Sequence, residues 1–167
     1  VSTSTFVPKP HTPFVWFGQN TLDKIELKQK FLKENLKGKY IKYSWHNPLI
    51  SRLEAVIARG DEKIGDLIYG AWKNGAKFDS WEECLNLDAW DKAFKDLNIK
   101  PEDYASKEYD LDYSFPWDNI MHGVSKEFLK REYKKAIEGK TTKRCGVNSC
   151  SACGVTKISR CKYLENK

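Results

Sequence analysis

The sequence predicts an α+β protein that is mostly α-helical: a short strand–helix–strand, then a helical extension and a cysteine-rich tail. Three observations support this class. Apolar residues recur at helical spacing in several segments between residues 21 and 138. Residues 2–7 and 39–45 alternate in the way that half-exposed strands do. Four cysteines gather within 17 residues near the end of the chain.

The first twenty residues are predicted to be extended. Residues 2–7 are rich in Thr and Val. Pro8, Pro10 and Pro13 forbid a helix and restrict the residues before them to extended geometry. Residues 14–17 form a short aromatic and apolar run, which we expect to be buried.

A helix is expected at residues 21–37, and a strand at residues 39–45. Asn20 or Thr21 can cap the helix, and Gly38 can end it. A helix followed by a strand suggests an α/β unit with short connections.

The chain after residue 46 is predicted to be helical. Ser51 with Glu54 and Ser80 with Glu83 match capping boxes. Asp61 is expected to begin a further helix. The residues expected to face inward on the first two of these helices are Leu53, Val56, Ile57, Ile64, Leu67, Ile68 and Trp72.

Three shorter helices should follow. Asp88 can cap residues 89–97, where Trp90, Phe94 and Leu97 share a side, and Pro101 suits the first turn of the next helix. An acidic, aromatic stretch at 106–119 is expected to be a structured loop. Ser125 should cap a last helix at 126–138, and its inward face should comprise Phe128, Leu129, Tyr133, Ala136 and Ile137.

Composition indicates a folded chain without a membrane span. Six Trp, eight Tyr and eight Phe provide enough large apolar surface to build a core. No apolar run approaches the roughly 20 residues needed to cross a bilayer, and no signal peptide is present. We therefore expect a soluble, cytoplasmic protein with no membrane partner. The β-prone start at Val1 suggests a piece of a longer polypeptide; a processed N-terminus is the alternative.

The charge changes sign along the chain. Residues 79–118 carry a net charge of −8, and residues 119–167 carry +8. The basic end can fold back on the acidic middle, or it can offer a cationic face to phosphates. In the second case the candidate nucleic-acid-binding residues are Lys140, Lys143, Arg144, Lys157 and Arg160.

The tail cysteines give the sharpest chemical signal. Cys145, Cys150, Cys153 and Cys161 have the spacing C-x4-C-x2-C-x7-C. Clustered thiols in a cytosolic chain favour a metal over disulfides, and thiolates suit zinc or an iron–sulfur cluster. Free or oxidised thiols on a flexible tail are the alternative. Cys84 stands alone and is expected to be a small core residue.

No other complete active site is evident. Each of the three His is isolated in the sequence, and a lone His is more often structural than catalytic. The acidic residues of 79–118 form no diagnostic pair. The chain has no glycine-rich phosphate loop, nucleophile elbow or H-E-x-x-H motif.

Several long phrases resemble a known family. STFVPKPHTPF at 4–14 resembles a phrase near the end of the barrel in several radical SAM enzymes. SWHNP at 44–48 with SRLEAVIARGD at 51–61 resembles the next block of one subgroup, and FPWDNI at 115–120 with GVSKEFL at 123–129 resembles its closing block. That subgroup is uncharacterised and often has a cobalamin-binding-type domain ahead of the barrel. The resemblance spans nearly all 167 residues.

The resemblance implies three segments. Residues 1–45 would be the last strand–helix–strand of the barrel region, residues 46–139 a helical extension, and residues 140–167 a basic metal-binding tail. The remainder of the same polypeptide would then be its main partner. The resemblance also suggests residues that face the active site, namely His11, His46, Arg52 and Glu54.

Two departures from the family limit what the chain can do alone. The C-x3-C-x2-C motif that holds the [4Fe-4S] cluster and S-adenosylmethionine is absent, so these cofactors belong only to the full-length protein. The fourth tail cysteine of the subgroup would fall at Thr156. Either Cys161 takes its place, or three thiolates leave an open position on an iron–sulfur cluster.

Three functions are therefore open. In the first, the chain is the non-catalytic C-terminal part of a radical SAM enzyme with an auxiliary iron–sulfur or zinc site. Alternatively, it is a zinc-knuckle module that binds nucleic acid or protein, with RNA or a ribosomal component as the expected partner. The third possibility is a structural extension with unliganded thiols.

Overall fold

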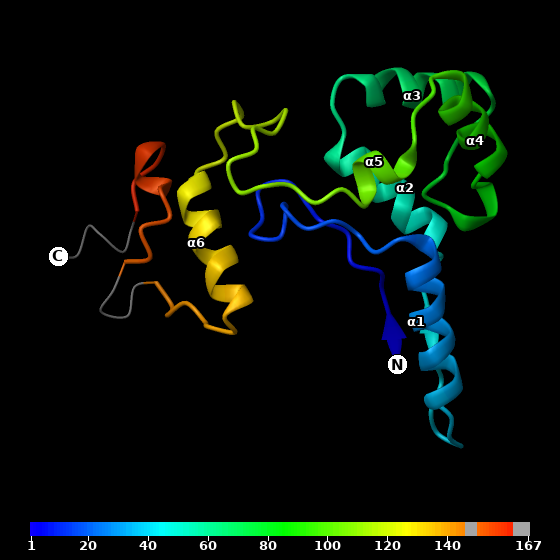
Figure 1. Cartoon of the computed structure of the whole chain (residues 1–167), viewed down its shortest axis with the longest axis horizontal. Helices are drawn as coiled ribbons and strands as arrows, with labels where there is room; N and C mark the ends of the chain where they lie inside the picture. The colour runs from blue at the N-terminus through cyan, green and yellow to red at the C-terminus, as the bar shows by residue number, and fades with distance from the viewer. Residues whose placement is uncertain (146–149, 162–167) are drawn as a thin grey trace. The chain divides into compact units, whose positions relative to one another are not determined.

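The computed structural model describes residues 1–145 and 150–161. They are mostly helical with one two-stranded sheet, which confirms the expected α+β, mostly α-helical class. The elements are β1 (Ser2–Thr3), α1 (Leu22–Asn35), β2 (Ser44–Trp45), α2 (Pro48–Arg59), α3 (Lys63–Lys73), the 3₁₀ turn η1 (Glu82–Cys84), α4 (Leu87–Asp96), α5 (Pro101–Ala105), α6 (Lys126–Ile137) and the 3₁₀ turn η2 (Val155–Lys157) (Figure 1).

The chain forms two compact units. The first unit comprises Val1–Pro8 and Phe17–Glu108, and the second comprises Lys9–Trp16 and Tyr109–Lys167. The first therefore contains the sheet and α1 to α5, whereas the second contains α6 and the cysteine tail. The three-segment division expected from the family resemblance stays a prediction.

The sheet of the first unit is a parallel pair joined through α1. Ser2 pairs with Ser44 and Thr3 with Trp45, and the His46 N–H donates to the Thr3 carbonyl at 3.2 Å. The strand expected at 39–45 is shorter than predicted, because Ile41 donates back to the Gly38 carbonyl and closes a turn there. The strand–helix–strand order expected for the start of the chain is present.

Helix α2 begins earlier than the capping box predicted. The Asn47 side chain accepts a hydrogen bond from the Leu49 N–H at 2.9 Å, and Pro48 occupies the first helical position. Ser51 lies inside the helix, where its hydroxyl donates to the Asn47 carbonyl. The Asn-Pro pair is the stronger start signal, so the prediction of Ser51 as the cap was wrong.

Two other predicted caps were also wrong. Asn86 caps α4 by accepting from the Ala89 N–H at 3.1 Å, which places Asp88 in the first turn instead. Ser80 caps nothing, because the segment after it forms only the 3₁₀ turn, whose cap position is Trp81. A turn this short leaves a capping box few amides to satisfy.

The core of the first unit comes from α2, α3 and α4. Val56 and Leu67 are fully buried, and Trp90 and Phe94 pack in the same cluster. The inward faces predicted for these helices are wider than the buried faces observed. At least 41% of the surface is exposed at four predicted inward positions, namely Ile57, Ile68, Trp72 and Leu97. Cys84 is exposed as well, which contradicts its prediction as a core residue. A narrow apolar stripe satisfies helices that each have neighbours on one side only.

Arg59 fastens α2 to the chain after α5. This residue is only 2% exposed, and its guanidinium donates to the carbonyls of Tyr104, Ala105 and Lys107 at 2.6–2.8 Å. Gly18 lies against the same stretch, since a Cβ there would fall 2.1 Å from the Ser106 carbonyl oxygen. The first unit thus depends on one buried cation and one close backbone approach.

The second unit has a small aromatic core. Val15, Trp16, Phe115 and Leu129 are buried, and the Tyr133 ring meets Trp16 edge-on at 5.7 Å. Ser125 caps α6 as predicted, with its hydroxyl accepting from the Phe128 N–H at 3.2 Å. The expected inward face of α6 was too long, because Ala136 and Ile137 at its end are exposed.

Candidate metal-binding turn and adjoining pocket

Residues Cys150–Gly154 form a tight turn around a sulfur atom. The Ala152 N–H donates to the Cys150 Sγ at 3.3 Å. Ala152 and Gly154 both adopt left-handed backbone conformations, with φ of 49° and 98°. The turn therefore aims a backbone amide at the sulfur of the first cysteine in the C-x2-C pair.

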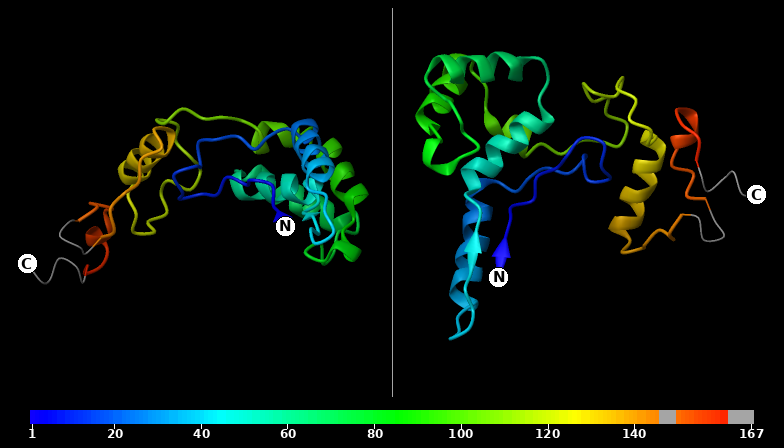
Figure 2. Two further views of the ribbon diagram at one scale, coloured as in Figure 1. Left: turned by 90° about the horizontal axis from the view of Figure 1, so that it is seen from below. Right: turned by 180° about the vertical axis from the view of Figure 1, so that it is seen from behind.

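This turn is fastened to the N-terminal half of α6. The Ser125 N–H donates to the Cys153 carbonyl at 2.7 Å, and Arg131 donates to the carbonyls of Ser151 and Ala152 at 3.1 and 2.9 Å. A Cβ at Gly154 would lie 2.9 Å from the Ser125 Cβ, so only glycine permits this approach. The turn lies alongside α6 in every view (Figures 1 and 2).

The four tail cysteines do not yet surround one point. Cys150 is exposed, and Cys145, Cys153 and Cys161 are half-buried. Within residues 1–145 and 150–161, no group of three or more His, Cys, Asp or Glu side chains is placed to hold a metal ion. The donor set nevertheless fits a soft metal, because the C-x2-C pair with its amide-to-sulfur bond supplies half of a thiolate site. A metal could draw the remaining thiols in as it binds.

The basic end of the chain divides into paired and free cations. On α6, Lys126 pairs with Asp118 and Lys130 with Asp112, each at 2.6 Å, which is the fold-back expected for a basic segment after an acidic one. The Lys130 hydrogen bond lowers the pKa of the exposed Asp112 carboxyl.

In the tail the picture is different. Lys140 forms an exposed pair with Glu138 at 2.7 Å. Four cations are exposed and make no ion pair with any described residue, namely Lys143, Arg144, Lys157 and Arg160. These side chains are available to a partner.

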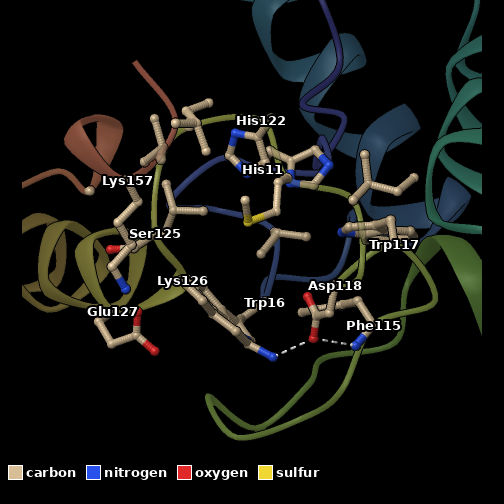
Figure 3. Close-up of a pocket in the computed structure, with 18 residues that line it drawn as sticks. His11, Trp16, Phe115, Trp117, Asp118, His122, Ser125, Lys126, Glu127 and Lys157 are labelled. Atoms are coloured by element: carbon tan, nitrogen blue, oxygen red, sulfur yellow. Dashed lines mark hydrogen bonds and ion pairs between the residues drawn. The ribbon is translucent and has the colours of Figure 1, made fainter. Parts of the chain in front are cut away.

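A pocket of about 210 Å³ opens within the second unit. Its walls are mostly apolar and aromatic, and they come from the N-terminal segment, the loop before α6, the start of α6 and the tail turn (Figure 3). Its aromatic lining residues are Trp16, Phe115 and Trp117, with Phe115 and Trp117 stacked at 5.0 Å. Trp117 is half-buried, and Trp16 and Phe115 belong to the buried core. Lys157, one of the free cations, also lines the pocket.

Two histidines meet at the pocket. The centroids of the His11 and His122 rings lie 3.7 Å apart. No nitrogen of either ring has a hydrogen-bond partner among the described residues. His11 adopts a left-handed backbone with φ of 58°. Desolvation lowers the pKa of His11, and the nearby His122 lowers it further, against a smaller opposing effect of Asp118. His11 is therefore neutral at pH 7, with one donor and one acceptor nitrogen.

An ion pair closes the lower wall of the pocket. Asp118 accepts from Lys126 at 2.6 Å and from the Phe115 N–H at 2.9 Å (Figure 3). The Lys126 ammonium also donates to the Tyr113 carbonyl and lies 5.6 Å from the centre of the Phe115 ring. These bonds hold the aromatic wall in place and neutralise the charge of Asp118.

The remaining residues proposed to face an active site lie in the first unit. His46 is exposed just before α2, and Glu54 is exposed on that helix. Arg52 forms an ion pair with Glu102 at 3.1 Å. Among the four, His11 alone lines the pocket of the second unit.

Sequence reasoning did not find the pocket. Its two histidines are 111 positions apart, and each is isolated in its own segment. The only signal in the sequence was that both segments, around His11 and around Phe115–Asp118, belong to phrases that resemble the radical SAM subgroup.

No helix in the described part of the chain has both the length and the apolar character needed to cross a bilayer. Comparison of the chain with protein-family models, curated proteins and solved structures found no match.

Proposed function

We propose that this chain is the C-terminal part of a radical SAM enzyme and carries an auxiliary metal site built on the Cys150–Gly154 turn. The observation that carries the proposal is the amide-to-sulfur hydrogen bond from Ala152 to Cys150 within a C-x2-C pair anchored to α6. Cys150 and Cys153 would be the first two ligands, and Cys145 and Cys161 the candidates for the others. When bound, an iron–sulfur cluster there would supply electron transfer or an open iron position, and zinc would supply a rigid cross-link.

The β1–α1–β2 unit supports the radical SAM part of the proposal. Two parallel strands of two residues each form too small a sheet to be stable alone, and parallel sheets are normally covered on both faces. Leu27 and Phe31 on α1 are exposed by 67% and 63%. Further strands beside β1 and β2, as in a barrel, would hydrogen-bond to the edges of the sheet and would cover this apolar surface.

A second candidate is a zinc-knuckle module that binds nucleic acid. The exposed, unpaired cations of the tail favour it, because the cations of α6 are largely neutralised and those of the tail are not. The same turn would hold zinc in this case.

Anaerobic purification followed by metal analysis and absorption spectroscopy tests both candidates. A brown protein with iron, sulfide and charge-transfer bands supports the auxiliary cluster, whereas a colourless protein with stoichiometric zinc supports the knuckle. Cys150→Ser or Cys153→Ser should reduce the metal content to background. Cys84→Ser is the matched control, since that thiol is also exposed but lies in the first unit.

The outcomes separate the candidates from the third possibility. If anaerobic reconstitution loads no metal, or if Cys150→Ser binds as much as the unchanged protein, the turn is not a metal site. If metal is bound, Cys145→Ser and Cys161→Ser show which further thiol is a ligand, because only the loss of a ligand weakens metal binding strongly.

A further inference from the structure

The pocket of the second unit has no role in the metal proposal. Its volume is about 210 Å³. Aromatic walls favour flat groups, because a planar ring can stack on them.

Three ring systems of the pocket make no side-chain hydrogen bond to any described residue, although Asp118, Lys126 and Ser125 do. Both imidazoles lack a hydrogen-bond partner among the described residues, and so does the buried Nε1–H of Trp16. A ligand with hydrogen-bond donors and acceptors along its edge would supply partners for the ring nitrogens of the two histidines. A purely apolar ligand would leave them unpaired.

Charges of both signs line the pocket, since Asp118 is paired with Lys126 and Glu127 is exposed. Lys157 lines it, and Arg160 follows three residues later in the same exposed stretch. Neither has an ion-pair partner among the described residues. Two exposed cations in and just after the 3₁₀ turn η2, beside an aromatic site, match a polyanion that carries flat groups between its charges.

We propose that the second unit binds a single-stranded polynucleotide by inserting one base into this pocket. The base would stack on the aromatic wall, and its polar edge would contact His11 and His122 while Lys157 contacts a flanking phosphate. An acidic peptide would use the cations but would leave the pocket empty. The inference rests on the second candidate function, the nucleic-acid-binding module, and does not require the metal.

Fluorescence anisotropy with the full chain and oligonucleotides of about eight nucleotides tests the inference. RNA and DNA strands of each base are compared with strands that lack all bases and with free mononucleotides. With two phosphates contacted, by Lys157 and Arg160, the affinity should fall about sevenfold between 50 and 200 mM salt. Stacking of one base should make the natural strand bind about 5- to 150-fold tighter than the abasic one. RNA and DNA that differ in affinity identify a contact to the 2′-hydroxyl.

Variants of the pocket sharpen the test. His122→Ala removes an exposed ring, and His11→Asn keeps a residue that tolerates the left-handed backbone. Both should weaken binding of the natural strand and leave binding of the abasic strand unchanged. Lys157→Ala should weaken both strands equally. Lys24→Ala and Lys28→Ala, at exposed residues of the first unit, are the controls and should change binding of neither strand.

Each contrary result overturns a defined part. If natural and abasic strands bind equally but with a steep salt dependence, base insertion is wrong and the nucleic-acid-binding module stands. If no strand binds with salt dependence, both fail. If mononucleotides bind as tightly as the strands, the ligand is not a polynucleotide, and the pocket is a site for a free nucleotide. An acidic peptide that binds tighter than any strand also overturns the inference.

Discussion

Gly154→Ala tests the contact that positions the proposed metal-binding turn. Gly154 has φ of 98°, and the added methyl group would lie 2.9 Å from the Ser125 Cβ and 3.1 Å from the Ser125 nitrogen. The left-handed backbone alone costs an alanine about 1–2 kcal/mol. Relieving the clash would break the Ser125 to Cys153 hydrogen bond and leave a helix N–H unsatisfied, at a further cost of about 1–3 kcal/mol.

Gly139→Ala is the matched control. Gly139 also has a positive φ, of 66°, but its Cβ would meet nothing within 4 Å. This variant should therefore show only the backbone cost of about 1–2 kcal/mol. The difference between the two variants isolates the contact between the turn and α6.

Two measurements report the effect. Amide hydrogen exchange at Ser125 should accelerate about tenfold or more in Gly154→Ala, because every 1.4 kcal/mol is a factor of ten. Cobalt(II) affinity, measured by thiolate charge-transfer absorption, should fall by a similar factor. If Gly139→Ala and Gly154→Ala have equal effects on both measurements, the close approach to Ser125 does not hold the turn.

Three further predictions follow from other contacts. Ala152→Gly should relieve the left-handed backbone at φ of 49° by about 1 kcal/mol and raise cobalt(II) affinity about fivefold; weaker binding would contradict this. Arg59→Ala should lower the free energy of unfolding by about 3–5 kcal/mol in urea, because one buried and two partly buried carbonyls lose the donor that a buried guanidinium supplies. Arg52→Ala, at a partly exposed ion pair, should cost under about 1 kcal/mol. The pKa of His11 is lowered in the folded state, so the unfolded chain binds more protons and stability should fall as pH drops below about 6.5. His11→Asn should flatten that part of the thermal unfolding profile, and an unchanged slope would exclude His11 as the cause.

Local signals in the sequence predicted the helices well. Ser125 caps α6 as expected, and Pro101 begins α5, because both act within one turn of the backbone. Where two local signals competed, the stronger one decided the start. At α2 the Asn47-Pro48 pair overrode Ser51, because proline fits the first helical position and asparagine caps it directly.

Exposure was harder to predict than helicity. Trp72 and Ile68 follow the apolar spacing of α3, yet they are 54% and 43% exposed. Spacing shows which residues share a face, and the number of neighbouring elements decides how much of that face is covered. Cys84 was misjudged for the same reason, since it lies in a surface 3₁₀ turn.

The amino-acid sequence by itself determined the mostly helical class, the C-x2-C pair and the basic residues around it. These follow from residue type and local spacing. Only the tertiary structure fastened Cys153 and Gly154 to the start of α6 and brought His11 against His122 beside an aromatic wall. Contacts between residues far apart in the chain depend on how the elements pack, and no local pattern encodes that packing.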